Sequence, residues 1–425
     1  MSRPPPSGRS TSQYGIEVRS NAVWATDWDR CYCPLEWHTR WITWNDVSHK
    51  QPVGSMRVAR GSAWSVSETL ETPGHGALVM SGSIPRVSRR AWLAAGAAGA
   101  LQERWRINAA DAAKPGFLFR KTGRVILPRG PAGSFDSTHA KYPCVLKHGD
   151  RWMMWYSGRG DDAFTGSIGL ATSRDGLHWS KAAKGRPVLE PGGVATADET
   201  KADHPAVVRF AGRFHMWYTA GPRDSRYRIC YATSEDGLRW QRQNGGRPVL
   251  GPGSQGKFDD RVVLHPAVVR DPRGLLHMWY NGVGPQQDFR IGHATSRDGI
   301  RWERQNGGDA VLSPGSVSGR REIYVYNAMV LLENGVYRMW YSSALEITPR
   351  GRFAPHGSAI VYAESRDGTN WIQDNAITLL SGDQGAEDAY ACFAPYVVRR
   401  GSVLWMYYSM GSADQRYQTG LAKCP

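Results

Sequence analysis

The chain has 425 residues and a formal net charge of +15 at pH 7, from 53 Lys and Arg against 38 Asp and Glu. The positive charge is dispersed, with neither a Lys/Arg block nor a recognition-helix pattern, which argues against a nucleic-acid partner. The six Cys show no zinc-type spacing with His, and the apolar run at 91–101 is too short to span a bilayer. We therefore expect neither a zinc knuckle nor a membrane segment.

The first 115 residues contain no repeat and differ in character from the rest of the chain. Within about 86–113, the word containing Arg89-Arg90 and the short apolar run after it resemble a twin-arginine export signal, and Ala110-Asp111-Ala112 would be its cleavage site. Met80 would then be the true start. We expect 1–115 to be a disordered leader and the protein to be exported to the periplasm or the exterior. A disordered Arg-rich leader on a cytoplasmic protein is the alternative.

Residues 116–425 consist of five copies of one unit, spaced by about 62 residues. Four copies carry a Met-Trp-Tyr strand followed by an Asp-Gly-x-x-Trp hairpin, and the fifth carries Met-Tyr-Tyr. The strands begin at Met154, Met216, Met278, Met339 and Met406, and the hairpins at Asp175, Asp236, Asp298 and Asp367. In the second copy we expect four short strands, at 204–209, 214–219, 228–233 and 238–242. This pattern predicts an all-β fold, a five-bladed β-propeller of four-stranded blades.

The two ends of this region predict that the ring closes on itself. The fifth copy stops after its third strand, and Gly123–Leu127 matches Gly185–Leu189 and Gly246–Leu250, which follow outer strands. The segment near 117–121 is therefore expected to pair beside 416–423 as the missing outer strand, which removes an exposed edge. A chance match between unrelated loops is the alternative.

Each inner strand is preceded by an acid, so several carboxylates are expected at one rim of the channel. Glycoside hydrolysis needs such a cluster, with one protonated acid and one ionised carboxylate. Asp203 and Glu322 differ from the residues at the equivalent positions of the other copies, which favours a function. Asp136 and Asp259 recur in a Phe-Asp word that could simply cap strands.

The other repeated words are expected to be structural. The Met-Trp-Tyr strands would pack between blades, and the Asp-Gly-x-x-Trp words would fix hairpins. Cys144, Cys230 and Cys392 fall in expected strands and are interpreted as buried thiols.

The words Met-Trp-Tyr-x-Gly, Ile-Gly-x-Ala-Thr-Ser-x-Asp-Gly-x-x-Trp and Pro-Val-Leu resemble the five-bladed propeller glycosidases, a superfamily of arabinanases, xylosidases, levansucrases, invertases and mannoside phosphorylases. The resemblance implies an Asp, a second Asp and a Glu acid from successive blades, which Asp136, Asp203 and Glu322 match in order. The family's Glu usually comes from the third blade, where this chain has Asp259-Asp260. The hairpin is also similar to the Asp-box of sialidases, without their arginine triad.

These observations predict a glycoside hydrolase-like enzyme that acts on an oligo- or polysaccharide. Asp136, Asp203 and Glu322 are the expected catalytic residues, with Glu322 as the acid. The expected sugar contacts are His204, His265, Tyr326, Asp260 and Asp388. No cofactor is expected, although the channel could hold a structural calcium ion. A non-catalytic carbohydrate- or protein-binding propeller is the alternative, and a glycan phosphorylase or a sialidase-like enzyme is a further one.

Overall fold

The computed structural model describes residues 117–161, 165–222, 226–346, 357–382, 386–412, 414 and 416–425. The predictions for the leader, including the export signal within 86–113, lie outside these residues. Across the described ranges there is no α-helix, and none of the helical turns is long and apolar enough to cross a membrane.

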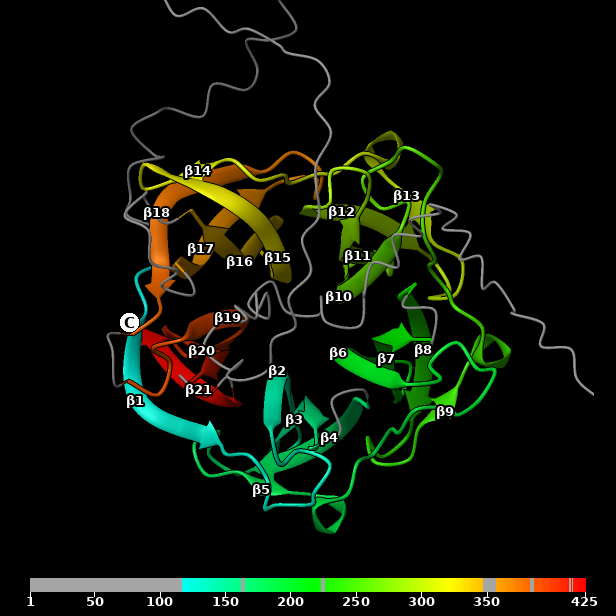
Figure 1. The fold of residues 1–425 in the computed structure, drawn as a ribbon, viewed down its shortest axis with the longest axis vertical. Coiled ribbons are helices and arrows are strands. Elements are labelled where there is room, and N and C mark those ends of the chain that lie inside the picture. Colours follow the sequence, from blue (N-terminus) through cyan, green and yellow to red (C-terminus); the bar gives the residue numbers. More distant parts are fainter. Residues whose placement is uncertain are drawn as a thin grey trace, which may run out of the picture. The chain divides into compact units, whose positions relative to one another are not determined.

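The described residues form five blades arranged around a central axis, which confirms the predicted five-bladed propeller (Figure 1). These blades make four hydrogen-bonded sheets, because a parallel pairing of His139 with Tyr417 joins blades five and one. The bounds of the strands, blade by blade, are as follows. Blade one has β2 (His139–His148), β3 (Arg151–Arg159), β4 (Ser167–Ser173) and β5 (Ser180–Lys181); blade two has β6 (Lys201–Phe210), β7 (Arg213–Gly221), β8 (Arg228–Ser234) and β9 (Gln241–Arg242). Blade three has β10 (Val262–Arg270), β11 (Leu276–Val283), β12 (Phe289–Ser296) and β13 (Glu303–Arg304). Blade four has β15 (Arg320–Glu333), β16 (Val336–Leu345), β17 (Gly357–Ser365) and β18 (Ile372–Leu380), with the short β14 (Ser316–Val317) beside β15. Blade five has β19 (Ala391–Arg400), β20 (Val403–Gly411) and β21 (Tyr417–Cys424).

The ring closes through β1 (Arg120–Leu127), which pairs antiparallel with β21, as predicted (Figure 1, cyan beside red). The strand is longer than the expected 117–121 and includes the Gly123–Leu127 word. One reason is that Val125 stands where the matching words have Pro187 and Pro248, so its backbone N–H is available to a sheet ladder. Leu127 lies opposite Thr419, as Leu189 lies opposite Ile168 in blade one.

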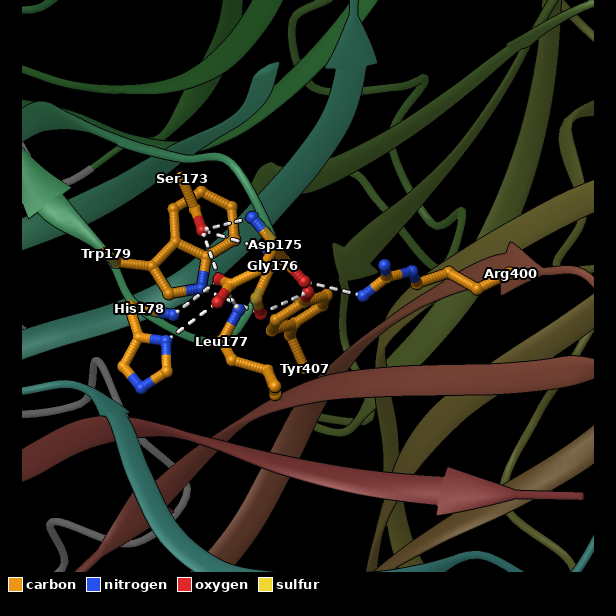
Figure 2. Close-up of polar contacts among 8 residues, drawn as sticks. All are labelled: Ser173, Asp175, Gly176, Leu177, His178, Trp179, Arg400 and Tyr407. Carbon is orange, nitrogen blue, oxygen red and sulfur yellow. Dashed lines mark hydrogen bonds and ion pairs between the residues drawn. The ribbon is translucent and has the colours of Figure 1, made fainter. Parts of the chain in front are cut away.

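The Asp-Gly-x-x-Trp words form the tight hairpins that precede each outer strand. In blade one, Asp175 Oδ1 accepts hydrogen bonds from the backbone N–H groups of Leu177 (2.8 Å) and His178 (2.9 Å), and Gly176 adopts a φ of 71° (Figure 2). These bonds and the one from the His178 ring lower the pKa of Asp175. Because the turn uses these residues, the outer strand of blade two is only β9, shorter than the expected 238–242.

The Trp of the first three Met-Trp-Tyr words packs between blades and donates to the hairpin of the next blade. The indole N–H groups of Trp155, Trp217 and Trp279 reach the carbonyl oxygens of Gly237, Gly299 and Gly368 at 2.8–2.9 Å. In the fifth copy Tyr407 replaces Trp, and its hydroxyl donates to Gly176 O at 2.8 Å, joining blade five to blade one (Figure 2). Arg400 donates to the neighbouring Asp175 O at 2.6 Å. The repeated words are thus structural, as predicted.

The three cysteines expected in strands, Cys144, Cys230 and Cys392, are buried free thiols.

Every inner strand contains a one-residue bulge in the left-handed conformation, and this bulge positions the channel. The bulge N–H donates to the side chain that follows the Met-Trp-Tyr word of the preceding blade, for example His204 N to Ser157 Oγ and His265 N to Thr219 Oγ1, both at 2.9 Å. Tyr142 N to Ser409 Oγ, also at 2.9 Å, closes the circle. The bulge residues are Tyr142, His204, His265, Asn327 and Ala394.

Candidate active site

Five buried acids, one in each blade, form a repeated contact that we call the clamp. In blade one, Asp136 is 1% exposed, accepts a hydrogen bond from Tyr156 Oη at 2.9 Å and pairs with Lys181 Nζ at 2.6 Å. The tyrosine comes from the Met-Trp-Tyr strand and the cation from the outer strand. The other clamps are Asp198 with Tyr218 and Arg242, Asp259 with Tyr280 and Arg304, Glu322 with Tyr341 and Gln373, and Asp388 with Tyr408 and Lys121.

The clamps correct part of the predicted site. Asp136 and Glu322 do not share an axial pocket with Asp203, because each lies inside its own blade. Asp388, expected to contact sugar, is the clamp acid of blade five. Glu322 lies five residues before its bulge where the four Asp lie six before theirs, and its longer side chain reaches the same place. The clamps of blades one to three could have been found in the sequence from the Tyr of each strand word and the cation two residues after each hairpin Trp.

The bulge residues meet at the axis and close the channel there. The rings of Tyr142 and His204 have centroids 3.4 Å apart, and those of His204 and His265 are 3.8 Å apart. The pKa of His204 lies well below its ordinary value because of burial and the nearby Lys141 and Lys201, and burial beside His204 lowers that of His265. Both imidazoles are therefore uncharged at pH 7, and they lie at the predicted axial place.

Two further residues predicted to contact sugar have structural partners. Tyr326 is fully buried in an aromatic cluster with Phe393 and Tyr417. Asp260 Oδ2 accepts a hydrogen bond from Gly256 N at 2.7 Å in the loop before its strand.

A small pocket lies beside the bulge ring, at the end of the channel where the inner strands begin. It has a volume of about 20 Å³ and lies between blades one and two. Its lining includes His139, Lys141, Arg159, Lys201 and Asp203. We call it the mouth pocket, and it is the one part of the predicted site that the structure retains, through Asp203.

The polar groups of the mouth pocket are held by the strands and by aromatic rings. Lys141 Nζ lies 4.9 Å from the Tyr142 ring centroid and 4.7 Å from that of Tyr417, and Lys201 Nζ lies 3.0 Å from Tyr227 Oη. Asp203 Oδ1 accepts from its neighbour His204 N at 3.0 Å. Two cations and a carboxylate are thus held close together with little exposure to water, where electrostatic interactions are strong.

His139 extends this group, and its pKa is lowered by burial and by Lys141. The neutral ring stacks edge-on against Tyr417 at 4.8 Å. It therefore offers the pocket a neutral hydrogen-bonding group beside the charges.

The cavity on the other side of the bulge ring has a different chemistry. It measures about 70 Å³ and is lined mainly by apolar residues, among them Pro143, Pro205, Pro266 and Pro395. Its lining includes no carboxylate. Of these two cavities, the mouth pocket is the one with a carboxylate in its lining.

The side chains of the bulge ring offer few oxygen ligands for the structural calcium ion that the sequence left open. Calcium takes about six to eight oxygen ligands, whereas the ring residues offer mainly imidazole nitrogens and one amide. Within the ranges described, no group of three or more His, Cys, Asp or Glu is placed to hold a metal ion.

No family model matches the chain. An uncharacterized protein, Rv1502, of Mycobacterium tuberculosis is 37% identical over 155 residues, covering 35% of this chain and 48% of its own length. A 1,2-beta-oligomannan phosphorylase of Thermoanaerobacter sp. (strain X514) is 31% identical over 150 residues, covering 32% and 49%. The chain thus matches about half the length of these curated relatives.

Solved structures share the propeller fold at low sequence identity. One described as a glycoside hydrolase has a TM-score of 0.58 and 20% identity, covering 76% of this chain and 95% of its own. Another, from work on the GH130 family of mannoside phosphorylases and glycoside hydrolases, has a TM-score of 0.55 and 18% identity, covering 72% and 93%. The fold is therefore that of propeller glycoside hydrolases and mannoside phosphorylases, as the sequence words predicted.

Proposed function

We propose that the protein is an enzyme that cleaves glycosidic bonds at the mouth pocket, with Asp203 as the proton donor to the leaving oxygen. The observation that carries this proposal is the placement of Asp203. In the inner strands, the residues equivalent to it are Lys141, Leu264, Tyr326 and Phe393, so it is the one carboxylate at this level of the ring. The likeness to propeller glycoside hydrolases supports the same reaction class.

The surroundings of Asp203 suit a sugar substrate. The buried Tyr142, Tyr227 and Tyr417 contact the two lysines and hold their ammonium groups near the pocket. The neutral His139 ring can exchange hydrogen bonds with hydroxyl groups. A protonated Asp203 would donate its proton to the glycosidic oxygen as the bond to the anomeric carbon breaks, and in hydrolysis a water molecule would bond to that carbon and lose a proton to solvent.

Phosphorolysis is a second candidate, favoured by the same single carboxylate. A hydrolase with two catalytic carboxylates holds them about 5–5.5 Å or 6.5–9.5 Å apart, and the other predicted members of that set lie inside clamps. In phosphorolysis, inorganic phosphate attacks the anomeric carbon, so one acid on the protein is sufficient. The partial match to an oligomannan phosphorylase supports this candidate.

The test is a panel of aryl glycosides and oligosaccharides, assayed with the full chain in the presence and absence of phosphate. We expect turnover, with Asp203→Asn reducing its rate at least ~10²-fold, the usual scale for acid–base assistance. Asp150→Asn, at an exposed turn, is the matched control and should retain the rate. Near-full activity of Asp203→Asn would refute its role. No turnover of any member would favour the carbohydrate- or protein-binding propeller.

A further inference from the structure

The mouth pocket lies where blade one has a glycine at a position that is aromatic in three of the other blades. In each blade, the residue whose side chain accepts from the bulge N–H pairs with a residue on the third strand. Two residues before that third-strand partner stand Tyr227 in blade two, Phe289 in blade three, Ser358 in blade four and Tyr417 in blade five. In blade one this residue is Gly166. Where two neighbouring interfaces have a tyrosine ring, the interface between blades one and two has an opening.

The opening leads directly to charged groups. A methyl group on Gly166 would lie 3.4 Å from Lys201 Cγ and 3.7 Å from Asp203 Cγ, which is ordinary contact distance. Gly166 also holds the two blades together, because its N–H donates to Thr200 O at 3.2 Å and its carbonyl accepts from Ala202 N at 2.9 Å. The walls of the pocket are thus fixed by backbone, and its chemistry is set by the side chains around the missing ring.

The pocket has a cationic lining that selects for an anion. Lys141, Arg159 and Lys201 line it against the one carboxylate of Asp203. Lys141 is 6% exposed and contacts two ring faces, and in the described parts of the chain no salt bridge joins it to a carboxylate. Buried ammonium groups are normally paired with an anion, so a ligand carrying one would gain the interaction that Lys141 lacks.

The small size of the pocket limits how much of an oxyanion these charges would hold. Its volume of about 20 Å³ is room for about one water molecule. One edge of a planar carboxylate fits this space, whereas free phosphate needs room for a tetrahedral ion. A carboxylate carried on a sugar would leave the sugar ring outside the pocket.

We propose that the mouth pocket binds the carboxylate of an acidic sugar residue, of the uronic acid type, and so selects an acidic glycan as substrate. This inference rests on the proposed function for the catalytic use of the site, since Asp203 lines the same pocket. The carboxylate would accept from Lys141 and Lys201, and the sugar would be held with its glycosidic bond near Asp203.

The experiment measures binding, independently of turnover, by calorimetry on the full chain. Glucuronate and galacturonate are compared with glucose and galactose at low salt, and inorganic phosphate is the competitor. We expect the acidic sugars to bind at least about tenfold more tightly than the neutral ones, the scale of a charged hydrogen bond. Added salt should weaken this preference.

Two variants locate the binding. Lys141→Met should remove the preference for acidic sugars, and Lys257→Met, at an exposed ion pair, is its control. Gly166→Ala fills the pocket without changing a charge and should weaken acidic-sugar binding at least about tenfold. Gly251→Ala, whose added methyl group would meet open space, should not.

The outcomes separate this inference from the proposed function. Equal affinity for acidic and neutral sugars, or phosphate binding that depends on Lys141 while acidic sugars do not bind, overturns the inference even if Asp203-dependent cleavage of neutral glycosides is found. Acidic-sugar binding lost in Lys141→Met and Gly166→Ala, in a protein that cleaves no glycoside, supports the inference and removes the proposed function. Asp203→Asn should abolish turnover and retain acidic-sugar binding.

Discussion

The carboxylates inside the blades and the carboxylate at the mouth pocket differ in how often they recur. The clamp appears in all five blades, each time with a tyrosine at the same strand position and a partner from the outer strand. Asp203 has no acidic counterpart at its level of the ring. A residue type that every blade needs serves the blade, and a residue that one blade alone carries is available for chemistry.

The clamps recur for an energetic reason. A carboxylate withdrawn from water is costly unless it is hydrogen-bonded and paired. In blade three the Asp259 carboxylate, fully buried, meets this need with Tyr280 Oη at 2.9 Å and Arg304 Nε at 2.8 Å. Asp203 is more exposed, and the outer-strand cation of its blade, Arg242, pairs with Asp198 instead, so the Asp203 carboxyl group faces the pocket.

The contrast between clamp acids and Asp203 would fail most clearly if a clamp acid proved dispensable for stability. Asp259→Ala leaves Arg304 and Tyr280 without their partner and should lower the free energy of unfolding by about 3–5 kcal/mol. Asp203→Asn should change it by less than about 1 kcal/mol. Urea unfolding followed by tryptophan fluorescence measures both. Equal losses in the two variants would show that Asp203 is a structural acid as well.

The fifth clamp tests ring closure, because its cation comes from the opposite end of the described chain. Lys121 Nζ in β1 lies 2.5 Å from Asp388 Oδ2. Lys121→Met should cost about 3 kcal/mol, near the lower end for a broken buried pair because the lysine is partly exposed. Arg120→Met, on the neighbouring exposed residue, is the matched control and should unfold at the wild-type urea concentration.

The channel ring should carry a pH dependence of its own. Burial holds the pKa values of His139, His204 and His265 below their ordinary value of 6.5. The unfolded chain therefore binds protons that the folded ring does not. Stability is full above pH 6.5 and falls as the pH drops below it, by about 1.4 kcal/mol per pH unit for each such histidine.

Thermal unfolding between pH 7.5 and 4.5 measures this slope. His204→Phe should reduce it by about one proton, whereas His178→Asn, on the exposed hairpin of blade one, serves as the control. If the stability of neither the wild type nor the His204→Phe variant changed with pH, the claim that these buried histidines are neutral in the folded protein would be wrong.

The smallest expected effect concerns the clamp of blade four, which has an amide in place of a cation. Gln373 lies opposite Ala363, as Lys181 lies opposite Ala171 and Arg242 opposite Ala232. Gln373→Lys should give Glu322 a charged partner and add about 1 kcal/mol to the free energy of unfolding. The gain should vanish in the Glu322→Gln background, as a double-mutant cycle would show.

Much of the fold could be read from the chain because the repeat is regular. Equal spacing of the strand words predicted the blades, and the missing outer strand predicted β1 beside β21. The site was less accessible, since Asp136 and Glu322 look like channel acids in a linear alignment. Their side chains point into the blade because they accept hydrogen bonds from Tyr156 and Tyr341, which lie on the next strand of the same blade.

The sequence by itself determined the number of blades, the structural roles of the repeated words and the axial place of His204 and His265, because these follow from local turn chemistry and from recurrence. Tertiary structure alone decided which carboxylates are satisfied and which pocket is open. Gly166 shows why: the absence of a side chain becomes a pocket only when the neighbouring blade brings Lys201 and Asp203 against it. Such contacts join residues far apart in the chain, and no local pattern contains them.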